Sequence, residues 1–201
     1  MTGTSVAIID SGGANIASLS NAFDRLGVSS VLTSDAPTIM NASHVVLPGV
    51  GTAADAMRRL DERQLIDIIT NLKQPVLGIC LGMQLIARSS EENSTPCLAI
   101  VPATVKKLAA SPQAPVPNMG WCKVNQVLPH ELFSGIAHNC WFYFAHSFAL
   151  ATGECTLATA NHREAFTAVL AHKNYFGVQF HPERSAEGGA RFLSNFLELR
   201  T

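Results

Sequence analysis

Short apolar runs alternate with helical patterns through the first half of the chain, and this alternation restricts the fold more than any other feature. The apolar runs, each read as a strand, cover residues 5–9, 29–32, 45–47 and 75–80. The helical patterns cover residues 16–26, 53–60, 64–72 and 81–88, and Gly27 stands where a helix C-cap glycine belongs. Strands that alternate with helices form parallel sheets covered on both faces.

The second half follows a different pattern. A proline-rich stretch at residues 111–117 precedes short strand patterns at 121–127, 141–148, 155–160, 166–171 and 175–180. A last helix is expected at residues 189–199, with Phe192, Phe196 and Leu199 on one face. These strands favour antiparallel pairings. We therefore predict one α/β domain over residues 1–201, with a mixed, mostly parallel sheet flanked by helices.

The charge balance excludes two classes of partner. The 201 residues carry 14 Lys plus Arg against 15 Asp plus Glu, a formal charge of −1. Binding to nucleic acid or to an anionic membrane calls for a clear basic excess.

The first five residues include no basic residue, and no apolar run approaches the roughly 18 residues that span a bilayer. We expect a cytoplasmic protein with neither a nucleic-acid nor a membrane partner.

Five cysteines are spread along the chain, and no two lie within a few residues of each other. This spacing fits neither a zinc site nor a small disulfide framework. The turn that begins at Asp10 lacks the spacing of a dinucleotide-binding loop, and no P-loop motif is present. We expect no metal and no cofactor, and most of the cysteines are interpreted as small core residues.

One cysteine has a different setting, because Gly78-Ile79-Cys80-Leu81-Gly82 stands between a strand pattern and a helix pattern. This is the cysteine form of the nucleophile elbow, a sharp turn that requires small residues two positions before and after the nucleophile. The following helix favours the thiolate, and the Leu81 N–H would face a developing oxyanion. The alternative is a buried structural cysteine in a glycine-flanked loop.

A thiol nucleophile needs a base, and His181 is the best of seven candidate histidines. It ends a strand pattern and is followed by Pro182 and Glu183. Residues two apart on an extended chain point to the same side, so the Glu183 carboxylate can reach the ring of His181 and fix its tautomer. A histidine two residues before a glutamate is a common pattern in proteins. It indicates a catalytic base here only because Cys80 supplies the nucleophile that such a base would serve.

The segment Pro48-Gly49-Val50-Gly51 follows the third strand pattern. Carboxyl ends of parallel strands line the ligand crevice, so this loop is expected beside Cys80. Its glycines allow backbone N–H groups to turn into the crevice as a second oxyanion donor. An ordinary turn between a strand and a helix is the alternative.

Four stretches together carry a resemblance to a known family. They are Val46-Leu47-Pro48-Gly49-Val50-Gly51, Gly78-Ile79-Cys80-Leu81-Gly82-Met83-Gln84-Leu85, Met119-Gly120-Trp121 and Gln179-Phe180-His181-Pro182-Glu183-Arg184-Ser185. The chain resembles the class I (triad) glutamine amidotransferases over almost its whole length. Within them it looks like the glutaminase subunits of imidazole glycerol phosphate synthases, which act in histidine biosynthesis.

The resemblance implies an activity and a set of site residues. Cys80 would attack the side-chain amide of glutamine, His181 would move the proton and Glu183 would orient His181. Oxyanion donors would come from Gly49, Val50 and Leu81, and glutamine contacts from Gly51, Gln84, Glu92 and Ser147. Glutamine would be hydrolysed to glutamate and ammonia through a cysteine thioester.

The resemblance also implies a partner, a (β/α)8-barrel cyclase subunit that receives the ammonia. It would dock over Asn15, Met119, Trp121, Tyr143 and Arg184. The chain departs from the family in three places that lie near this interface. They are Asn118 where histidine is common, Ala14 where glycine is frequent, and Arg184 where lysine is frequent.

Three other interpretations stay open at this point. A cysteine peptidase or chaperone-like relative can share the elbow, but it needs neither Gln84 nor the Pro48–Gly51 loop. A non-catalytic subunit would be expected to lack Cys80, His181 or Glu183. An amidotransferase domain that serves another synthase is the strongest alternative, and the partner protein would distinguish it.

Overall fold

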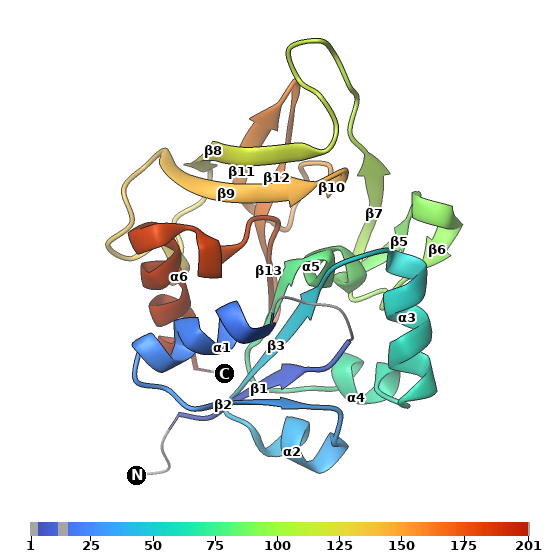
Figure 1. Ribbon diagram of the computed structural model, residues 1–201, viewed down its shortest axis with the longest axis vertical. Helices are drawn as coiled ribbons and strands as arrows, with labels where there is room; N and C mark the ends of the chain where they lie inside the picture. Colours follow the sequence, from blue (N-terminus) through green and yellow to red (C-terminus); the bar gives the residue numbers. More distant parts are fainter. Residues whose placement is uncertain (1–3, 12–15, 201) are drawn as a thin grey trace.

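The computed structural model describes residues 4–11 and 16–200, and its centre is a nine-stranded sheet (Figure 1). The strand order is β2-β1-β3-β4-β13-β12-β11-β8-β9. The strands are β1 (Val6–Ile9), β2 (Ser30–Thr33), β3 (His44–Gly49), β4 (Val76–Cys80), β8 (Asn118–Gln126), β9 (Cys140–His146), β11 (Thr156–His162), β12 (Glu164–His172) and β13 (Tyr175–Val178). Pairing is parallel from β2 across to β13 and antiparallel from β13 to β9. The predicted mixed sheet is confirmed, but four of its pairings are parallel and four antiparallel, so it is not mostly parallel, because the strands of this sheet from β8 onward pair with one another as antiparallel neighbours.

The parallel strands end together at one edge of the sheet. Gly49, the last residue of β3, pairs with Cys80, the last residue of β4. Val178, the last residue of β13, pairs with Ile79, next to Cys80. The carboxyl ends of three strands therefore meet, and each is followed by one of the segments that the sequence singled out.

A second sheet of four strands was not predicted. Its order is β10-β7-β5-β6, with β5 (Ala87–Ser90), β6 (Thr95–Pro96), β7 (Val101–Lys107) and β10 (Phe148–Leu150). The helix expected at residues 81–88 is wrong at its end, because α5 stops at Ile86 and Ala87 is extended. The carbonyl groups of Leu85 and Ile86 accept from the N–H groups of Leu98 and Ile100, which replaces the bonds that a longer helix would make.

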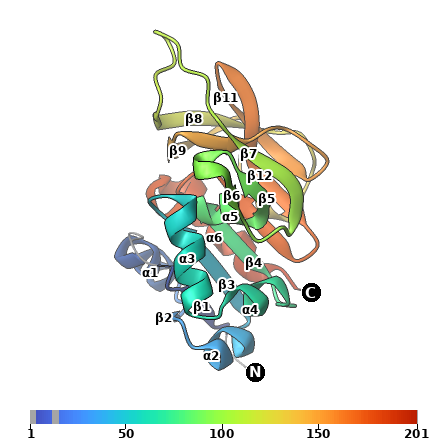
Figure 2. The ribbon, with the colours of Figure 1, turned by 90° about the vertical axis from the view of Figure 1, so that its right-hand side faces the viewer.

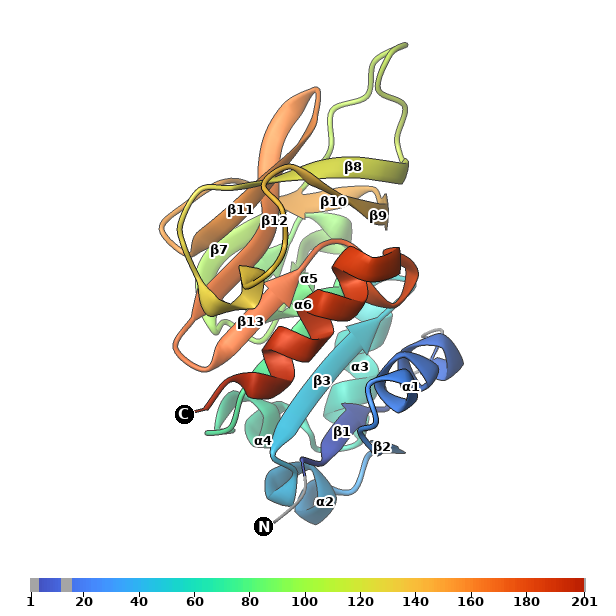
Figure 3. The same cartoon turned by 90° about the vertical axis from the view of Figure 1, so that its left-hand side faces the viewer.

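Helices cover both faces of the parallel strands. They are α1 (Ile16–Arg25), α2 (Ala36–Asn41), α3 (Ala53–Glu62), α4 (Ile66–Thr70), α5 (Leu81–Ile86) and α6 (Ala186–Glu198), with short 3-10 turns η1 (Glu92–Ser94), η2 (Glu131–Phe133) and η3 (Pro182–Arg184). Helices α1 and α6 lie on one face (Figure 3) and α3, α4 and α5 on the other (Figure 2). Helix α2 was not predicted, and α6 starts three residues before the expected position.

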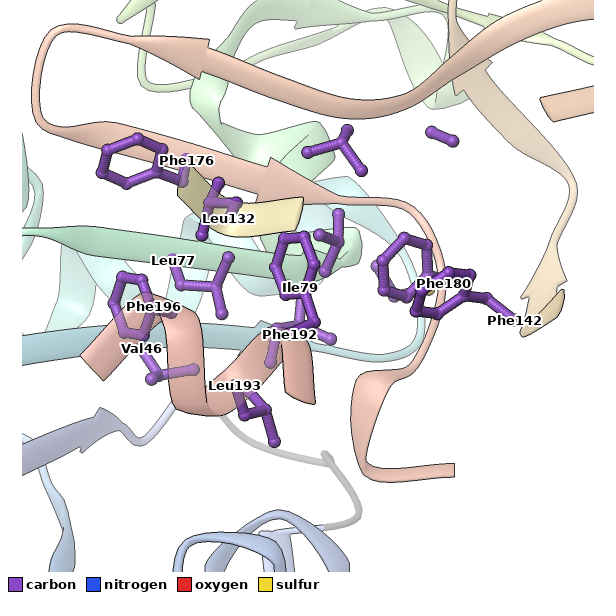
Figure 4. Packing of buried hydrophobic residues seen from close by; sticks show 14 of the residues in the cluster. Val46, Leu77, Ile79, Leu132, Phe142, Phe176, Phe180, Phe192, Leu193 and Phe196 are labelled. Atoms are coloured by element: carbon purple, nitrogen blue, oxygen red, sulfur yellow. The ribbon is translucent and has the colours of Figure 1, made fainter. Parts of the chain in front are cut away.

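Aromatic side chains of α6 attach this helix to the sheet. Phe192 and Phe196 are fully buried and belong to the same cluster as Val46 of β3 and Ile79 of β4 (Figure 4). Replacing a phenylalanine in such a core by alanine costs about 3–5 kcal/mol. The packing fixes α6, and with it the turn η3 that precedes it, against the carboxyl ends of the strands. Among the described residues, no helix is both long and apolar enough to cross a membrane.

Candidate active site

Cys80 stands at the point where β4 turns into α5. Its backbone has φ 54° and ψ −111°, a conformation that L-residues adopt only when the surroundings enforce it. The residue is buried but lines a cavity. The strained strand-to-helix turn is the geometry of a nucleophile elbow, as the spacing of the two flanking glycines indicates.

The two glycines of the elbow have no room for a side chain. A Cβ on Gly78 would lie 2.7 Å from the carbonyl oxygen of Gly82 and 2.7 Å from the amide nitrogen of Met83. A Cβ on Gly82 would overlap the carbonyl oxygen of Leu47 on the neighbouring strand β3. The prediction that both positions must be small is confirmed, and backbone contacts are the reason.

His181 and Glu183 form a pair beside the elbow. The Nδ1 atom of His181 lies 2.9 Å from Oε1 of Glu183, and their side chains are only 12% and 6% exposed. The backbone of His181 is held from both ends, since its N–H donates to the carbonyl of Tyr143 at 2.9 Å and its carbonyl accepts from Oγ of Ser185 at 2.7 Å. With Nδ1 occupied, Nε2 is the ring atom left for Cys80.

The electrostatics of the pair favour a charged imidazole. Burial lowers the pKa of His181, but hydrogen bonds and charges from Cys80 and Glu183 outweigh burial and raise this pKa to about 10. The second carboxylate oxygen of Glu183 is buried and has no hydrogen-bond partner among the described residues. The negative charge of the Glu183 carboxylate is therefore balanced mainly by the ring of His181. Because few other groups share that charge, the attraction between the carboxylate and the charged ring is stronger.

These residues face one cavity of about 380 Å³ at the carboxyl ends of β3 and β4. All ten residues expected to act in catalysis, in the oxyanion site or in glutamine binding line it: Gly49, Val50, Gly51, Cys80, Leu81, Gln84, Glu92, Ser147, His181 and Glu183. They come from loops and elements far apart in the sequence. A cavity of this size holds a small molecule and presents a thiol, an imidazole and a carboxylate to it.

Comparisons with known proteins agree with this chemistry. The family model described as glutamine amidotransferase class-I matches residues 7–199. The chain belongs to this family. It is 50% identical to "Imidazole glycerol phosphate synthase subunit HisH" of Pectobacterium atrosepticum, over 96% of this chain and 99% of that protein. It is 48% identical to the subunit of the same name from Haemophilus influenzae (strain 86-028NP), over 97% and 98% of the two chains.

Solved structures agree with the amidotransferase fold. A Thermotoga maritima glutamine amidotransferase has a TM-score of 0.67 at 20% identity and covers 98% of this chain and 83% of its own. A Thermoplasma acidophilum protein reaches a TM-score of 0.78 at 21% identity, over 98% of this chain and 94% of its own. At these identities the likeness concerns the fold.

In this amidotransferase, the loop that follows β3 lies beside Cys80. Gly51 has φ +89°, a backbone conformation that glycine adopts at little cost. Val50 is 37% exposed at the cavity wall. Behind the loop, Oε2 of Glu92 accepts from the Ala53 N–H at 2.7 Å, which connects η1 to the start of α3. Glu92 thus lines the cavity and also supports the element that follows the loop.

Sequence reasoning overlooked one residue next to the nucleophile. The Gln179 side chain is fully buried, with Nε2 3.8 Å from Sγ of Cys80 and Oε1 3.0 Å from Nε2 of Gln84. A signal was available, because Gln179 stands two residues before His181 at the end of the strand pattern 175–180, and alternate residues of a strand share a side.

Two of the expected docking residues line the cavity and two others continue from them by contact, while Asn15 lies outside the described residues. Met119 is 66% exposed and lines the cavity together with Arg184. The Arg184 guanidinium lies over the ring of Tyr143, 4.3 Å from its centroid. Trp121 packs edge-on against Tyr143 with ring centroids 6.1 Å apart and is 48% exposed.

Asn118, which stands where histidine is common in the family, contacts a neighbouring histidine. Nδ2 of Asn118 lies 3.0 Å from Nε2 of His146, and Nδ1 of His146 lies 2.8 Å from the carbonyl of Phe148. Burial lowers the pKa of His146 to about 4. The ring is therefore neutral at pH 7, donating from Nδ1 and accepting at Nε2. It forms a fixed, uncharged part of the cavity wall.

Three of the other cysteines are poor nucleophiles. Burial raises the pKa of Cys97 to about 11, and burial also raises the pKa of Cys122 and of Cys155. A raised thiol pKa leaves little thiolate at neutral pH. Among the described residues, no cluster of three or more His, Cys, Asp or Glu side chains has the geometry of a metal site.

Proposed function

We propose that this chain is the glutaminase subunit of an imidazole glycerol phosphate synthase and that Cys80, His181 and Glu183 are its catalytic triad. The observation that carries the proposal is the strained elbow at Cys80 facing the buried His181–Glu183 pair in one cavity. Relatives that match nearly the full length bear the name of that synthase subunit. The function is the supply of ammonia for histidine biosynthesis.

The reaction follows from the proposed roles. Cys80 gives its proton to His181, and the thiolate forms a bond to the carboxamide carbon of glutamine. His181 then protonates the amide nitrogen, the carbon–nitrogen bond breaks, and ammonia leaves a glutamyl thioester. Water attacks the thioester while His181 takes its proton, and glutamate leaves as the carbon–sulfur bond breaks. Glu183 orients the ring and stabilises its charged form.

The remaining lining residues supply binding and charge stabilisation. The Leu81 N–H and the peptides of Gly49 and Val50 would hold the oxyanion, a contribution of about 10²–10³ in rate per donor. Gly51, Gln84, Glu92 and Ser147 would contact glutamine. Both amide hydrogens of Gln84 are already used, by the carbonyl of Phe148 at 2.8 Å and by Gln179, so its oxygen is the group left to accept from the substrate.

Ammonia would pass to a partner, which we propose is a (β/α)8-barrel cyclase subunit in the cytoplasm. The docking surface would comprise Met119, Trp121, Tyr143 and Arg184, and Asn15 is the further residue expected there. Two of these side chains are large, apolar and about half exposed or more, which is typical of an interface rather than of a free surface.

The decisive experiment compares glutamine and ammonia as nitrogen donors in the complex. Cys80→Ala is expected to abolish glutamine-dependent synthesis and to leave ammonia-dependent synthesis intact, because the cyclase reaction needs only ammonia. Cys97→Ala is the matched control and should keep both activities. Glutamine hydrolysis by Cys80→Ala at the native rate would refute the nucleophile. Failure of the purified chain to bind a cyclase subunit would favour an amidotransferase that serves another synthase.

A further inference from the structure

Next to Cys80, the side chains of Gln179, which does not line the cavity, and Gln84, which does, form a short chain of hydrogen bonds. Nε2 of Gln179 points to Sγ of Cys80 at 3.8 Å, within the range of a hydrogen bond to sulfur. Oε1 of Gln179 accepts from Nε2 of Gln84 at 3.0 Å. Gln179 is fully buried and Gln84 is 4% exposed, so water does not compete for these groups.

The direction of this chain is set by one backbone carbonyl. The carbonyl oxygen of Phe148 can only accept, and it lies 2.8 Å from Nε2 of Gln84. The second hydrogen on that nitrogen goes to Oε1 of Gln179. Gln179 must then present its own Nε2 to the sulfur. If the amide of Gln179 were flipped, its Nε2 would face Nε2 of Gln84, donor against donor, and its oxygen would face Sγ of Cys80.

We propose that Gln179 is a positioning residue that donates a hydrogen bond to the Cys80 sulfur and stabilises its thiolate form, with its donor orientation fixed by Gln84 and the Phe148 carbonyl. The proposal deepens the proposed function and rests on Cys80 as the nucleophile. The donor approaches from the buried side, so it does not occupy the path of the substrate.

Two other groups affect the charge on the sulfur. The carbonyl oxygen of Ala145 lies 3.8 Å from Sγ and accepts from the protonated thiol, which Gln179 opposes. His181 attracts the thiolate from the cavity side. The other titratable or charged groups that line the cavity are Glu92, His146, Glu183 and Arg184. None of these four makes a hydrogen bond to the sulfur among the contacts of the described residues.

The size of the effect follows from the chemistry of thiolates. A hydrogen bond to a charged group corresponds to about tenfold in an equilibrium between charged and neutral forms. Nucleophilicity falls as the thiolate is stabilised, but by only about the square root of that factor. Loss of the donor is therefore expected to slow the reaction of the Cys80 thiolate at neutral pH by about threefold to tenfold. The acid limb of the curve of rate against pH should move to higher pH.

The experiment measures alkylation of Cys80 by iodoacetamide from pH 5 to 9, with the modified peptide quantified by mass spectrometry. Gln179→Met keeps the shape of the side chain and removes the donor. Its acid limb should move up by about half to one pH unit. Asn195→Leu is the matched control, because it also replaces a buried amide by an apolar side chain but lies away from Cys80, where it donates to Leu132 and Ser134. Its profile should equal that of the parent protein.

Steady-state kinetics separate the two glutamines. Gln179 does not line the cavity, so Gln179→Met should lower kcat and leave KM within about twofold. Gln84→Met should raise KM as well, because Gln84 lines the cavity and also holds the amide of Gln179. Gln179→Glu provides a second test that retains the shape of glutamine, and its carboxylate should move the acid limb further than methionine does.

An unchanged alkylation profile in Gln179→Met, or in Gln179→Glu where the methionine variant does not fold, would overturn the proposal. A shift of equal size in Asn195→Leu would also overturn it, since the effect would then come from general loosening of the fold. A failure of the proposed function gives a different result, namely a Cys80→Ala variant that still hydrolyses glutamine.

Discussion

The carbonyl oxygen of Leu47 occupies the position that a Cβ on Gly82 would need. Strand β3 and the first turn of α5 are thereby in backbone contact, with no side chain between them. This contact sets the distance between Cys80 and the loop that follows β3, because Gly49 and Cys80 end the two paired strands. The close approach brings the candidate oxyanion loop to the nucleophile.

Gly82→Ala is expected to destabilise the protein by about 3 kcal/mol or more, since the methyl group would push two backbones apart. The free energy of unfolding in urea tests this. Gly153→Ala is the control, because a Cβ at Gly153 would meet no atom within 4 Å. It should change stability by less than about 1 kcal/mol. Equal losses in the two variants would mean that the contact with Leu47 is not limiting.

The elbow and the parallel strands could be predicted because local patterns encode them. Apolar runs of three to six residues, a glycine-flanked cysteine and helical periodicity all act over short distances in the sequence. The register of β3 on β4 then follows from burial of both strands, which leaves few alternatives.

The second sheet and the end of α5 could not be predicted in this way. Residues 81–88 carry a helical pattern, but the carbonyl groups of Leu85 and Ile86 find partners at Leu98 and Ile100 instead. Such pairing depends on tertiary contacts that override local preference. The contact between Gln179 and Cys80 spans 99 positions, and only the assembled sheet reveals it.

Glu183→Gln should move the alkaline limb of glutaminase activity to lower pH. Burial lowers the pKa of His181, yet Cys80 and Glu183 together raise it to about 10, so the protonated ring needed by the leaving nitrogen persists up to about that pH. Removing the carboxylate charge lowers this pKa. The rate at neutral pH should also fall, by up to about 10⁴, as in related triads.

The pH profile of kcat/KM checks the prediction for Glu183. Glu187→Gln is the matched control, since it removes the same charge from an exposed position in the first turn of α6. It should reproduce the profile of the parent protein. If the alkaline limb of Glu183→Gln stays where it is in the parent protein, Glu183 does not stabilise the charged ring of His181.

Gly51→Ala should impair glutaminase activity through the backbone. Its φ of +89° costs an L-residue about 1–2 kcal/mol, although a Cβ there would meet no atom within 4 Å. The strain shifts the loop and misplaces an oxyanion donor, with an expected loss of up to about 10² in kcat. Gly27→Ala carries a similar strain at φ +73° in equally open space, but at the end of α1.

Both glycine variants should lose about the same stability, and only Gly51→Ala should lose activity per folded molecule. Thermal unfolding and initial rates give the two quantities. Equal activities in the two variants would show that the loop does not contribute to the oxyanion site.

The cavity mouth supplies the last prediction, which concerns the cyclase subunit. Trp121 is 48% exposed and packs edge-on against Tyr143, on which the Arg184 guanidinium also lies. A rigid aromatic side chain of this kind is typical of an interface hot spot, whose truncation costs about 2 kcal/mol or more. Trp121→Ala should therefore raise the Kd of the complex by about thirtyfold or more, measured by calorimetry with a purified cyclase subunit. Leu128→Ala is the matched control, since Leu128 is also 48% exposed but lies beyond the end of β8, where its N–H donates to the carbonyl of Leu157. A Kd raised equally by both substitutions, or by neither, would place the cyclase on another face of the molecule.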